Sequence, residues 1–295
     1  MAVRPSPPVF LALATALVVA WSSGFVGIRF SHDSASVPQI LFARSLFSGL
    51  GLLPFLIGPW GRGPAITARE LAEQGLFAFL GMFLYLGGFA MGIGAGVPTG
   101  LVALMADLVP LGIAALSAPM LGQGLTGRQW LGTGIACAGV LAVSADALAL
   151  GTAPVWAYAL PMLGMLAFAL STVLQERRGG SRLTIVQRLG LQCLWAAVLF
   201  APFAAAGGGL FPPISTDYAL GIAWLVVAAT YGAWLIYYQF LRLYPPAVVS
   251  AVVYLSPPVT MVWAFFLFDD PLTWPMALGL VVTLAGVALV ARRGG

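Results

Sequence analysis

The feature that most restricts the fold of this chain is a succession of long apolar stretches separated by short turns. Each stretch can cross a hydrocarbon core of about 30 Å as a helix, which takes roughly 17–25 residues. Membrane barrel strands alternate apolar and polar residues, whereas these stretches are continuous, so helices are predicted. The ten predicted spans are residues 9–29, 38–58, 70–92, 97–120, 127–145, 154–174, 185–206, 218–240, 246–268 and 273–291.

Composition supports a membrane protein and leaves little room for a soluble part. Only 7% of residues are charged and 61% are hydrophobic, against about 25% charged in an ordinary soluble domain. The gaps between spans are short and hold turn residues such as Gly61 and Pro64. The first span is too long for the apolar core of a secretory signal and has no convincing cleavage site, so we expect a retained helix.

The placement of the arginines predicts the orientation. With the N-terminus in the cytoplasm, the outer face has only Arg29, and Arg44 and Arg188 fall within spans. An excess of basic residues on one face indicates the cytoplasmic side, so both termini are predicted inside, at an anionic leaflet rather than on a nucleic acid. The inner face would hold ten arginines: Arg4, Arg62, Arg69, Arg128, Arg177, Arg178, Arg182, Arg242, Arg292 and Arg293.

An internal repeat divides the chain. LTWPMALGLVVTLAGVALV at 272–290 shares eight of nineteen positions with LTGRQWLGTGIACAGVLAV at 125–143, at an offset of 147 residues. Pro110 and Pro257 match at the same offset, and Trp21 with Phe168 and Arg44 with Arg188 match more loosely. We therefore expect two repeats, 1–147 and 148–295. Five spans per repeat is an odd number, so the second must be inverted in the membrane, an arrangement typical of transporters.

Several of these residues resemble a known family. Trp21-Ser22-Ser23 in the first span, Arg44 in the second and the Pro, Leu-Thr and Ala-Gly-Val signature ending each half are similar to the drug/metabolite transporter superfamily, and more narrowly to its EamA-type ten-helix exporters. The stretch VVAWSSGFVGIRF, with Tyr85, Trp234 and Tyr254, resembles the aromatic amino-acid exporter branch. The resemblance implies export of amino acids or related metabolites. It also implies a central cavity lined by the first, third, fourth, sixth, eighth and ninth helices.

Asp107 is the most telling candidate for the transport site. It lies about ten residues into the fourth span, where a bare carboxylate costs roughly 2.5–3.5 kcal/mol on insertion scales. It could contact a substrate ammonium or titrate to couple protons; alternatively, hydroxyls or an arginine could satisfy it within the fold. Its mate in the repeat is Tyr254.

Aromatic and small polar side chains on the implied cavity helices complete the candidate site. Such a lining suits an amphipathic small molecule, although each aromatic alone could equally face lipid. The candidates are Trp21, Ser22 and Ser23 on the first helix, Tyr85 and Phe89 on the third, Phe168 and Ser171 on the sixth, Tyr231, Trp234 and Tyr238 on the eighth, and Tyr254 and Trp263 on the ninth.

Prolines are the candidate hinges. Pro110, Pro257 and Pro258 interrupt the fourth and ninth spans at corresponding places, and a proline removes a backbone donor; a static kink is the alternative. Arg44 and Arg188 are expected to snorkel to headgroups. His32 is expected in the first outer loop, away from any proton relay.

Other classes of function fit less well. A serine protease would need a buried Ser–His pair and zinc hydrolysis a motif such as HExxH, and the sequence has neither, so we expect no enzyme, metal or cofactor. Cys137 and Cys193 are expected to be packing residues. A receptor or scaffold would not need an inverted repeat.

A small-multidrug antiporter would carry a glutamate in the first span. Phosphate carriers need cavity Lys or Arg, whereas this chain has no Lys and no arginine that we expect at the centre.

The sequence therefore predicts an all-α, ten-helix exporter of the bacterial inner membrane, acting as a monomer on neutral, small amphipathic metabolites such as amino acids. Its partners would be the small-molecule substrate and membrane lipid, with no nucleic acid. A multidrug or cation carrier, or a carrier of another metabolite in the same superfamily, remains the alternative. Proton-coupled and facilitated transport are both compatible with these residues.

Overall fold

The computed structural model describes residues 7–57, 60–61, 63–106, 108–122, 126–149, 153–178, 181–243, 252–253 and 255–291. Within these ranges every element of regular structure is helical. Seven helical stretches are long and apolar enough to cross a membrane, and three shorter apolar helices accompany them. The predicted all-helical membrane protein is confirmed, and each of the ten predicted spans contains a described helix.

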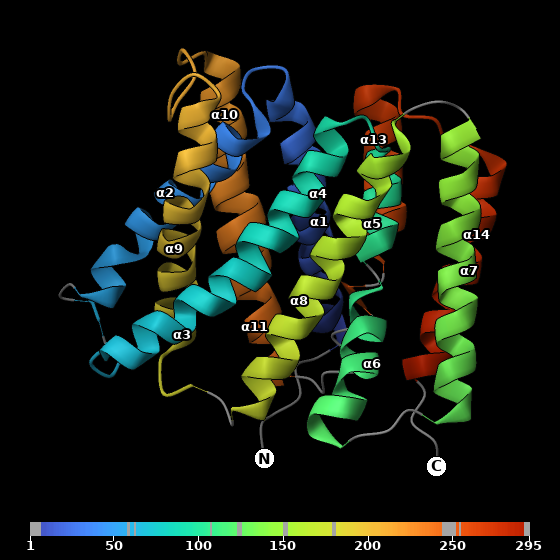
Figure 1. The fold of residues 1–295 in the computed structure, drawn as a ribbon, viewed down its shortest axis with the longest axis horizontal. Helices are drawn as coiled ribbons and strands as arrows, with labels where there is room; N and C mark the ends of the chain where they lie inside the picture. The colour runs from blue at the N-terminus through green and yellow to red at the C-terminus, as the bar shows by residue number, and fades with distance from the viewer. Residues whose placement is uncertain are drawn as a thin grey trace.

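The elements fall into two successive groups (Figure 1). The first half consists of α1 (Pro7–His32), α2 (Val37–Leu56), α3 (Ala68–Ala78), η1 (Phe79–Leu84), α4 (Tyr85–Gly94), α5 (Thr99–Ala106), α6 (Val109–Leu121) and α7 (Gly127–Ala149). The second half consists of η2 (Val155–Tyr158), α8 (Ala159–Arg177), α9 (Ile185–Ala206), α10 (Thr216–Trp224), η3 (Leu225–Gly232), α11 (Ala233–Leu243), α13 (Ser256–Phe268) and α14 (Trp274–Ala291).

Two predicted boundaries differ from the structure. The fourth span is divided into α5 and α6, with a new helix starting after Leu108 and a proline in its first turn. A proline there loses no hydrogen bond, because the first helical N–H groups have no intrahelical acceptor. The first span runs further than predicted, and His32 is the last residue of α1 rather than a loop residue.

The third and eighth spans each contain a π-helical segment in their middle. η1 separates α3 from α4, and η3 separates α10 from α11. At the offset of 147 residues, η1 corresponds to residues 226–231, which lie within η3. A π-helix inserts an extra residue into the turn and is frequent at functional sites. Both halves therefore carry the same irregularity at the same place.

The two halves meet along a seam of small residues between α7 and α14. A Cβ atom added to Gly139 would lie 2.8 Å from the Gly279 oxygen, and one added to Gly286 would lie 2.6 Å from the Gly132 oxygen. Thr283 donates to the Ala136 carbonyl at 3.4 Å, across 147 positions. The contacts are reciprocal, as in a two-fold interface. Residues further along α7 contact residues earlier in α14. The two helices are therefore antiparallel, side by side in Figure 1.

A second seam joins α2 and α9 at the opposite edge of Figure 1. A Cβ on Gly49 would lie 2.6 Å from Leu194 Cδ2, and one on Gly190 would lie 3.2 Å from Leu52 Cβ. Lipid tails are as apolar as leucine, so burial alone drives little helix association in a membrane, and close contacts between small residues are a main source of it. Both seams follow this rule.

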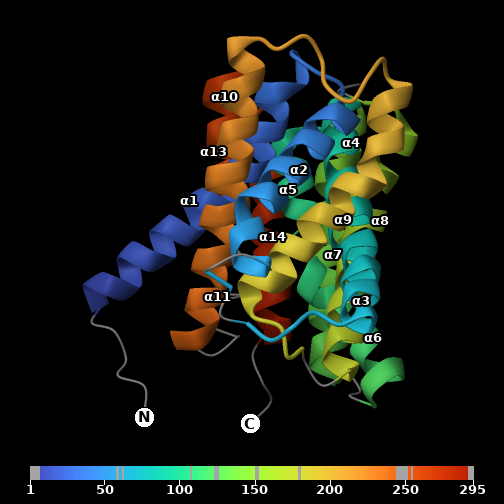
Figure 2. The same cartoon turned by 90° about the vertical axis from the view of Figure 1, so that its left-hand side faces the viewer.

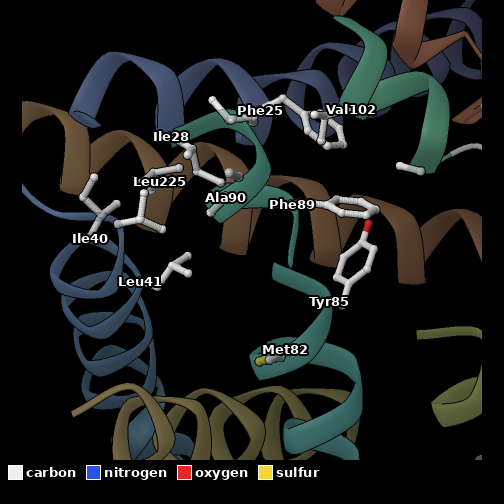
Figure 3. Close-up of a cluster of buried hydrophobic side chains, with 14 of the residues drawn as sticks. Phe25, Ile28, Ile40, Leu41, Met82, Tyr85, Phe89, Ala90, Val102 and Leu225 are labelled. Atoms are coloured by element: carbon white, nitrogen blue, oxygen red, sulfur yellow. The ribbon is translucent and has the colours of Figure 1, made fainter. Parts of the chain in front are cut away.

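The first helix of each half packs against the interrupted helix of the other half. α1 contacts α10, η3 and α11, while α8 contacts η1 and α4. Between them lies a buried cluster that includes Phe25, Phe89 and Leu225 (Figure 3). The interior of the bundle is thus built across the boundary between the halves, which leaves the space between α1, α4 and α11 available for a site.

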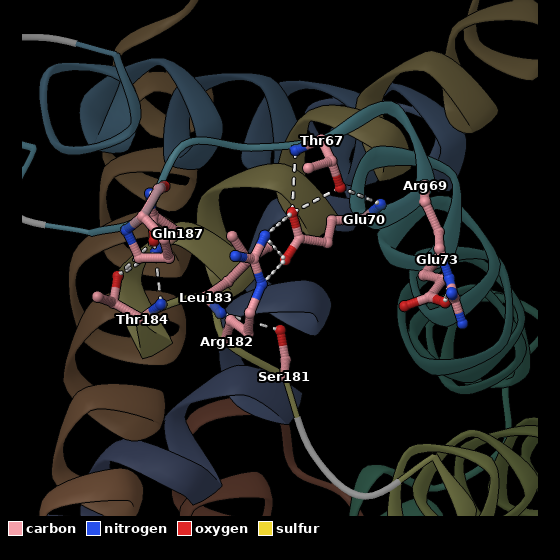
Figure 4. Close-up of polar contacts among 10 residues, drawn as sticks. Thr67, Arg69, Glu70, Glu73, Ser181, Arg182, Leu183, Thr184 and Gln187 are labelled. Atoms are coloured by element: carbon pink, nitrogen blue, oxygen red, sulfur yellow. Dashed lines mark hydrogen bonds and ion pairs between the residues drawn. The ribbon is translucent and has the colours of Figure 1, made fainter.

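Polar caps close the bundle at the end where α3 and α9 begin (Figure 4). Thr67 caps α3 and accepts from the Glu70 backbone N–H, and Arg182 donates to Glu70 Oε1 at 3.1 Å. Gln187, in the first turn of α9, donates to the Pro64 carbonyl at 2.9 Å. α1 starts and α14 ends at this same side of the molecule (Figures 1 and 2).

Candidate functional site

A small cavity lies between α1, α2, α4, η3 and α11 and holds about 50 Å³. One ordered water needs roughly 10–15 Å³, so the cavity has room for a few waters. Eight of the lining residues come from the first half and three from the second. They are Trp21, Gly24, Phe25, Ile28, Arg44, Tyr85, Leu86, Phe89, Ala229, Ala233 and Trp234.

One wall of the cavity consists of the rings of Trp21 and Trp234, from α1 and α11, and Tyr237 packs against both from outside the lining. The ring centroids of Trp21 and Trp234 are 5.7 Å apart, and those of Trp21 and Tyr237 are 5.3 Å apart. Trp234 and Tyr237 meet edge to face at 6.3 Å. Such geometries are favourable for aromatic pairs, so this wall is a fixed aromatic surface joining the two halves.

A second aromatic group continues from α4 to α8. Tyr85 lies 4.5 Å from both Phe89 and Phe168, measured between ring centroids. Phe168 in turn lies 6.3 Å from Trp234, which links the two aromatic groups. Tyr85 immediately follows η1, and Figure 3 shows Tyr85 and Phe89 beside each other near Phe25.

Arg44 also lines the cavity, which corrects the expectation that it snorkels to a headgroup. The residue is only 5% exposed. Its Nε donates to Thr230 Oγ1 at 3.0 Å, and the Thr230 hydroxyl donates to the Leu225 carbonyl at 2.9 Å. A residue two turns into a span can point to lipid or inward, and here the π-helical η3 offers a hydroxyl acceptor. The expectation of no central arginine is therefore wrong as well.

The structure brings five predicted site residues together: Trp21, Tyr85, Phe89, Phe168 and Trp234. The cavity is lined by the first, third and eighth spans, as the resemblance implied, and by the second. Among the described residues, the fourth, sixth and ninth spans supply no lining residue. Phe168 of the sixth span contacts two residues that do line it.

Other predicted residues lie in helix contacts outside the cavity lining. Ser22 donates to the Ser256 carbonyl at 3.1 Å and Ser23 to the Ala20 carbonyl at 2.6 Å. Ser171 accepts from Gln175 at 3.3 Å, and Tyr231 donates to the Ser48 carbonyl at 2.8 Å. The Trp263 ring lies 6.4 Å from Trp224. The contacts of Ser22, Tyr231 and Trp263 join different helices, whereas those of Ser23 and Ser171 lie within one helix.

Asp107 and Tyr254 lie outside the described residues, as does the side chain of Tyr238. The prolines are placed by their helices. Both α6 and α13 have a proline at the first or second helical position. Pro257 is buried and Pro258 is half-buried, whereas of Pro110 the structure describes the backbone.

Sequence reasoning missed seven of the lining residues: Gly24, Phe25, Ile28, Arg44, Leu86, Ala229 and Ala233. It also missed Tyr237, which packs against Trp21 and Trp234. Phe25 stands one helical turn after Trp21, so the i, i+4 rule that selects Phe89 from Tyr85 would have found it. Tyr237 is adjacent to the predicted Tyr238, and spacing of three or four residues permits either. The sequence carries no signal that turns Arg44 inward.

Two related helical halves that line one cavity are typical of secondary transporters. The chain belongs to the EamA-like transporter family: the family model matches it twice, at residues 8–145 and 155–292. It is therefore a multi-pass membrane transporter with two EamA repeats.

Relatives cover nearly all of the chain. A probable terminal-alkyne amino-acid exporter of Streptantibioticus cattleyicolor is 28% identical over 285 residues, covering 94% of this chain and 91% of the relative. The uncharacterized inner membrane transporter YedA of Escherichia coli K12 is 26% identical over 289 residues, covering 96% and 90%. A solved crystal structure at 19% identity has a TM-score of 0.62 and covers 96% and 98%, which shows a shared fold.

Proposed function

We propose that the protein exports amino acids, or similar small amphipathic metabolites, across the bacterial inner membrane by alternating access. The observation that carries this proposal is the small cavity lined by both halves, whose lining is aromatic and aliphatic apart from one buried arginine. Apolar pockets with a few placed polar groups bind small amphipathic ligands. The relative from Streptantibioticus cattleyicolor, described as a probable amino-acid exporter, supports the same substrate class.

The size of the cavity requires movement. A volume of about 50 Å³ is far below the roughly 300–1,000 Å³ of ordinary ligand pockets, so a substrate can enter only if the helices part. We infer that the halves, 1–147 and 148–295, rock about the site, as inverted repeats do. Pro110, Pro257 and Pro258 would act as hinges, and Asp107 would contact the substrate ammonium or carry protons.

We also propose a membrane orientation for the chain and a class of solute that it carries. Both termini would face the cytoplasm, in keeping with the arginine distribution; the relative YedA is an inner membrane transporter. A cation or multidrug carrier is disfavoured, because the buried Arg44 lines the cavity and repels positive charge in a low dielectric. A receptor or scaffold would bind without net movement of solute.

The test is uptake of labelled amino acids into vesicles reconstituted with the full chain, with and without a pH gradient. We expect saturable uptake of large neutral amino acids that empty vesicles lack. Stimulation by the gradient would indicate proton coupling, and equal uptake would indicate facilitated transport. Trp263→Ala, which lies outside the cavity lining, is the matched control and should transport as wild type does.

Absence of saturable uptake for every amino acid would contradict the proposed substrate class. Binding of amino acids with no movement into the vesicle lumen would instead favour the receptor alternative. Both results assume protein that elutes as a single species after extraction, which size-exclusion chromatography checks.

A further inference from the structure

Arg44 is the one charged side chain in the lining of the cavity, as far as the described residues go. Its exposure of 5% excludes a headgroup contact at the membrane surface. Among the described residues, the ion pairs are Arg69 with Glu73 and Arg182 with Glu70, both at the polar end of the bundle. The guanidinium thus stands in an apolar chamber without a described carboxylate partner.

The hydrogen bonds of Arg44 fix one edge of its guanidinium and leave the other edge for a ligand. Nε donates to Thr230 Oγ1 at 3.0 Å. Thr230 can accept because its own proton goes to the Leu225 carbonyl at 2.9 Å, five residues earlier. Within the described part of the chain, neither Nη group has a hydrogen-bond partner. A guanidinium has five N–H donors in a rigid fork, so most of its donors remain.

The free donors match one chemical group. Planar, paired N–H donors recognise carboxylates and phosphates bidentately. A buried, unpaired charge is unfavourable unless an anion pairs with it or water solvates it. Phosphate carries more charge than one arginine neutralises, and the rest of the lining is apolar or aromatic, so a monocarboxylate is the better match.

We infer that Arg44 binds the carboxylate of the substrate, while the aromatic rings of Trp21, Tyr85 and Trp234 contact the side chain of the substrate. This inference rests on the proposed transport function. One cavity would then hold both the carboxylate and the side chain of the substrate. Arg44 comes from α2 and Trp234 from α11, so a bound acid would bridge the two halves. A molecule with an aromatic group but no carboxylate would lack the first contact.

Direct binding tests this without relying on transport. Equilibrium dialysis of the purified full chain would measure labelled 3-phenylpropionate, which has the carboxylate alone, and labelled phenethylamine, which has the ammonium alone. We expect wild type to prefer the acid by about tenfold or more, since the guanidinium can pair bidentately with the carboxylate and repels the ammonium. Arg44→Gln should abolish this preference by weakening acid binding.

Two variants guard against a folding defect. Arg44→Lys keeps the charge without the fork and should retain part of the preference for the acid. Arg188→Gln removes the other arginine of the predicted spans, which does not line the cavity, and should keep the full preference. Thermal melting of each variant in detergent verifies that the compared proteins are folded.

Several outcomes would overturn the inference. One is an acid preference that survives Arg44→Gln; another is a loss that falls equally on the acid and the amine, which would make Arg44 a structural residue. If wild type shows no acid preference and Asp107→Asn does, Arg44 forms an ion pair with Asp107 instead of binding the substrate. Failure of wild type to bind the acid also rejects it. Amino-acid uptake by wild-type vesicles is scored separately, so loss of the proposed function is distinguishable.

Discussion

The two halves of the chain are alike where α7 packs against α14 and unlike where they line the cavity. Gly132, Ala136 and Gly139 of α7 lie against the residues of α14 that correspond to the same three positions at an offset of 147, which are Gly279, Thr283 and Gly286. The π-helical segments η1 and η3 also correspond. The scaffold therefore repeats closely.

The cavity does not repeat. At the same offset Trp21 corresponds to Phe168 and Tyr85 to Gly232, and Arg188, the looser match of Arg44, does not line the cavity. The first half supplies most of the lining, and the second half supplies Trp234 and two alanines. A symmetric scaffold gives two related conformations of similar energy, as alternating access requires. The asymmetric lining can then bind one substrate in one orientation.

The largest effect is expected from enlarging a seam glycine. In Gly139→Val the new side chain would press on the backbone of α14, which cannot yield as a side chain can, because a Cβ there already lies 2.8 Å from the Gly279 oxygen. Overpacking costs about 1–3 kcal/mol or more. Gly286→Val should cost a similar amount, since it makes the counterpart contact. Thermal melting in detergent would measure both.

Gly134→Val is the matched control. Gly134 lies on α7, and beyond its own helix no described atom lies within 4 Å of the place that a Cβ would take. Its counterpart in the second half is already Val281. The melting temperature of this variant should stay near that of wild type. Unequal losses at Gly139 and Gly286 would show that the seam is less symmetric than its contacts suggest.

A smaller effect, on substrate preference rather than on stability, is expected at Trp21 and its counterpart in the repeat, Phe168. Trp21→Ala should raise the KM for aromatic amino acids by about tenfold and change substrate preference, because the ring lines the cavity. Phe168→Ala removes a ring that only supports Tyr85 and Trp234, so its KM should change less. Uptake kinetics over a panel of amino acids would separate them. Equal changes in preference would contradict an asymmetric site.

The scaffold is predictable because membrane thickness and the repeat act on whole segments. Span length and the repeat can each be read along the chain, and the described helices follow them. The site is less predictable, because it depends on which way a side chain turns around its helix. Position along the span assigns Arg44 to the lipid headgroups, yet it turns inward to Thr230.

The π-helical segments explain part of that difficulty. A regular helix keeps side chains three or four residues apart on one face, and this rule selects Tyr231, Trp234 and Tyr238 together. η3 ends at Gly232, so Tyr231 belongs to the irregular segment and points to the Ser48 carbonyl, whereas Trp234 follows it and lines the cavity. Sequence periodicity does not reveal such a break.

The smallest effect is expected where the halves meet in water rather than in the apolar seam. Arg182 of the second half pairs with Glu70 of the first at 3.1 Å; the Arg182 side chain is 66% exposed and that of Glu70 is 12% exposed. Because the guanidinium lies largely in water, we expect the pair to contribute little and to be screened by salt. Arg182→Ala should therefore lower the melting temperature slightly at low salt and not at high salt, with uptake unchanged. A loss as large as that of Gly139→Val would mean that the polar end, and not the glycine seam, holds the halves together.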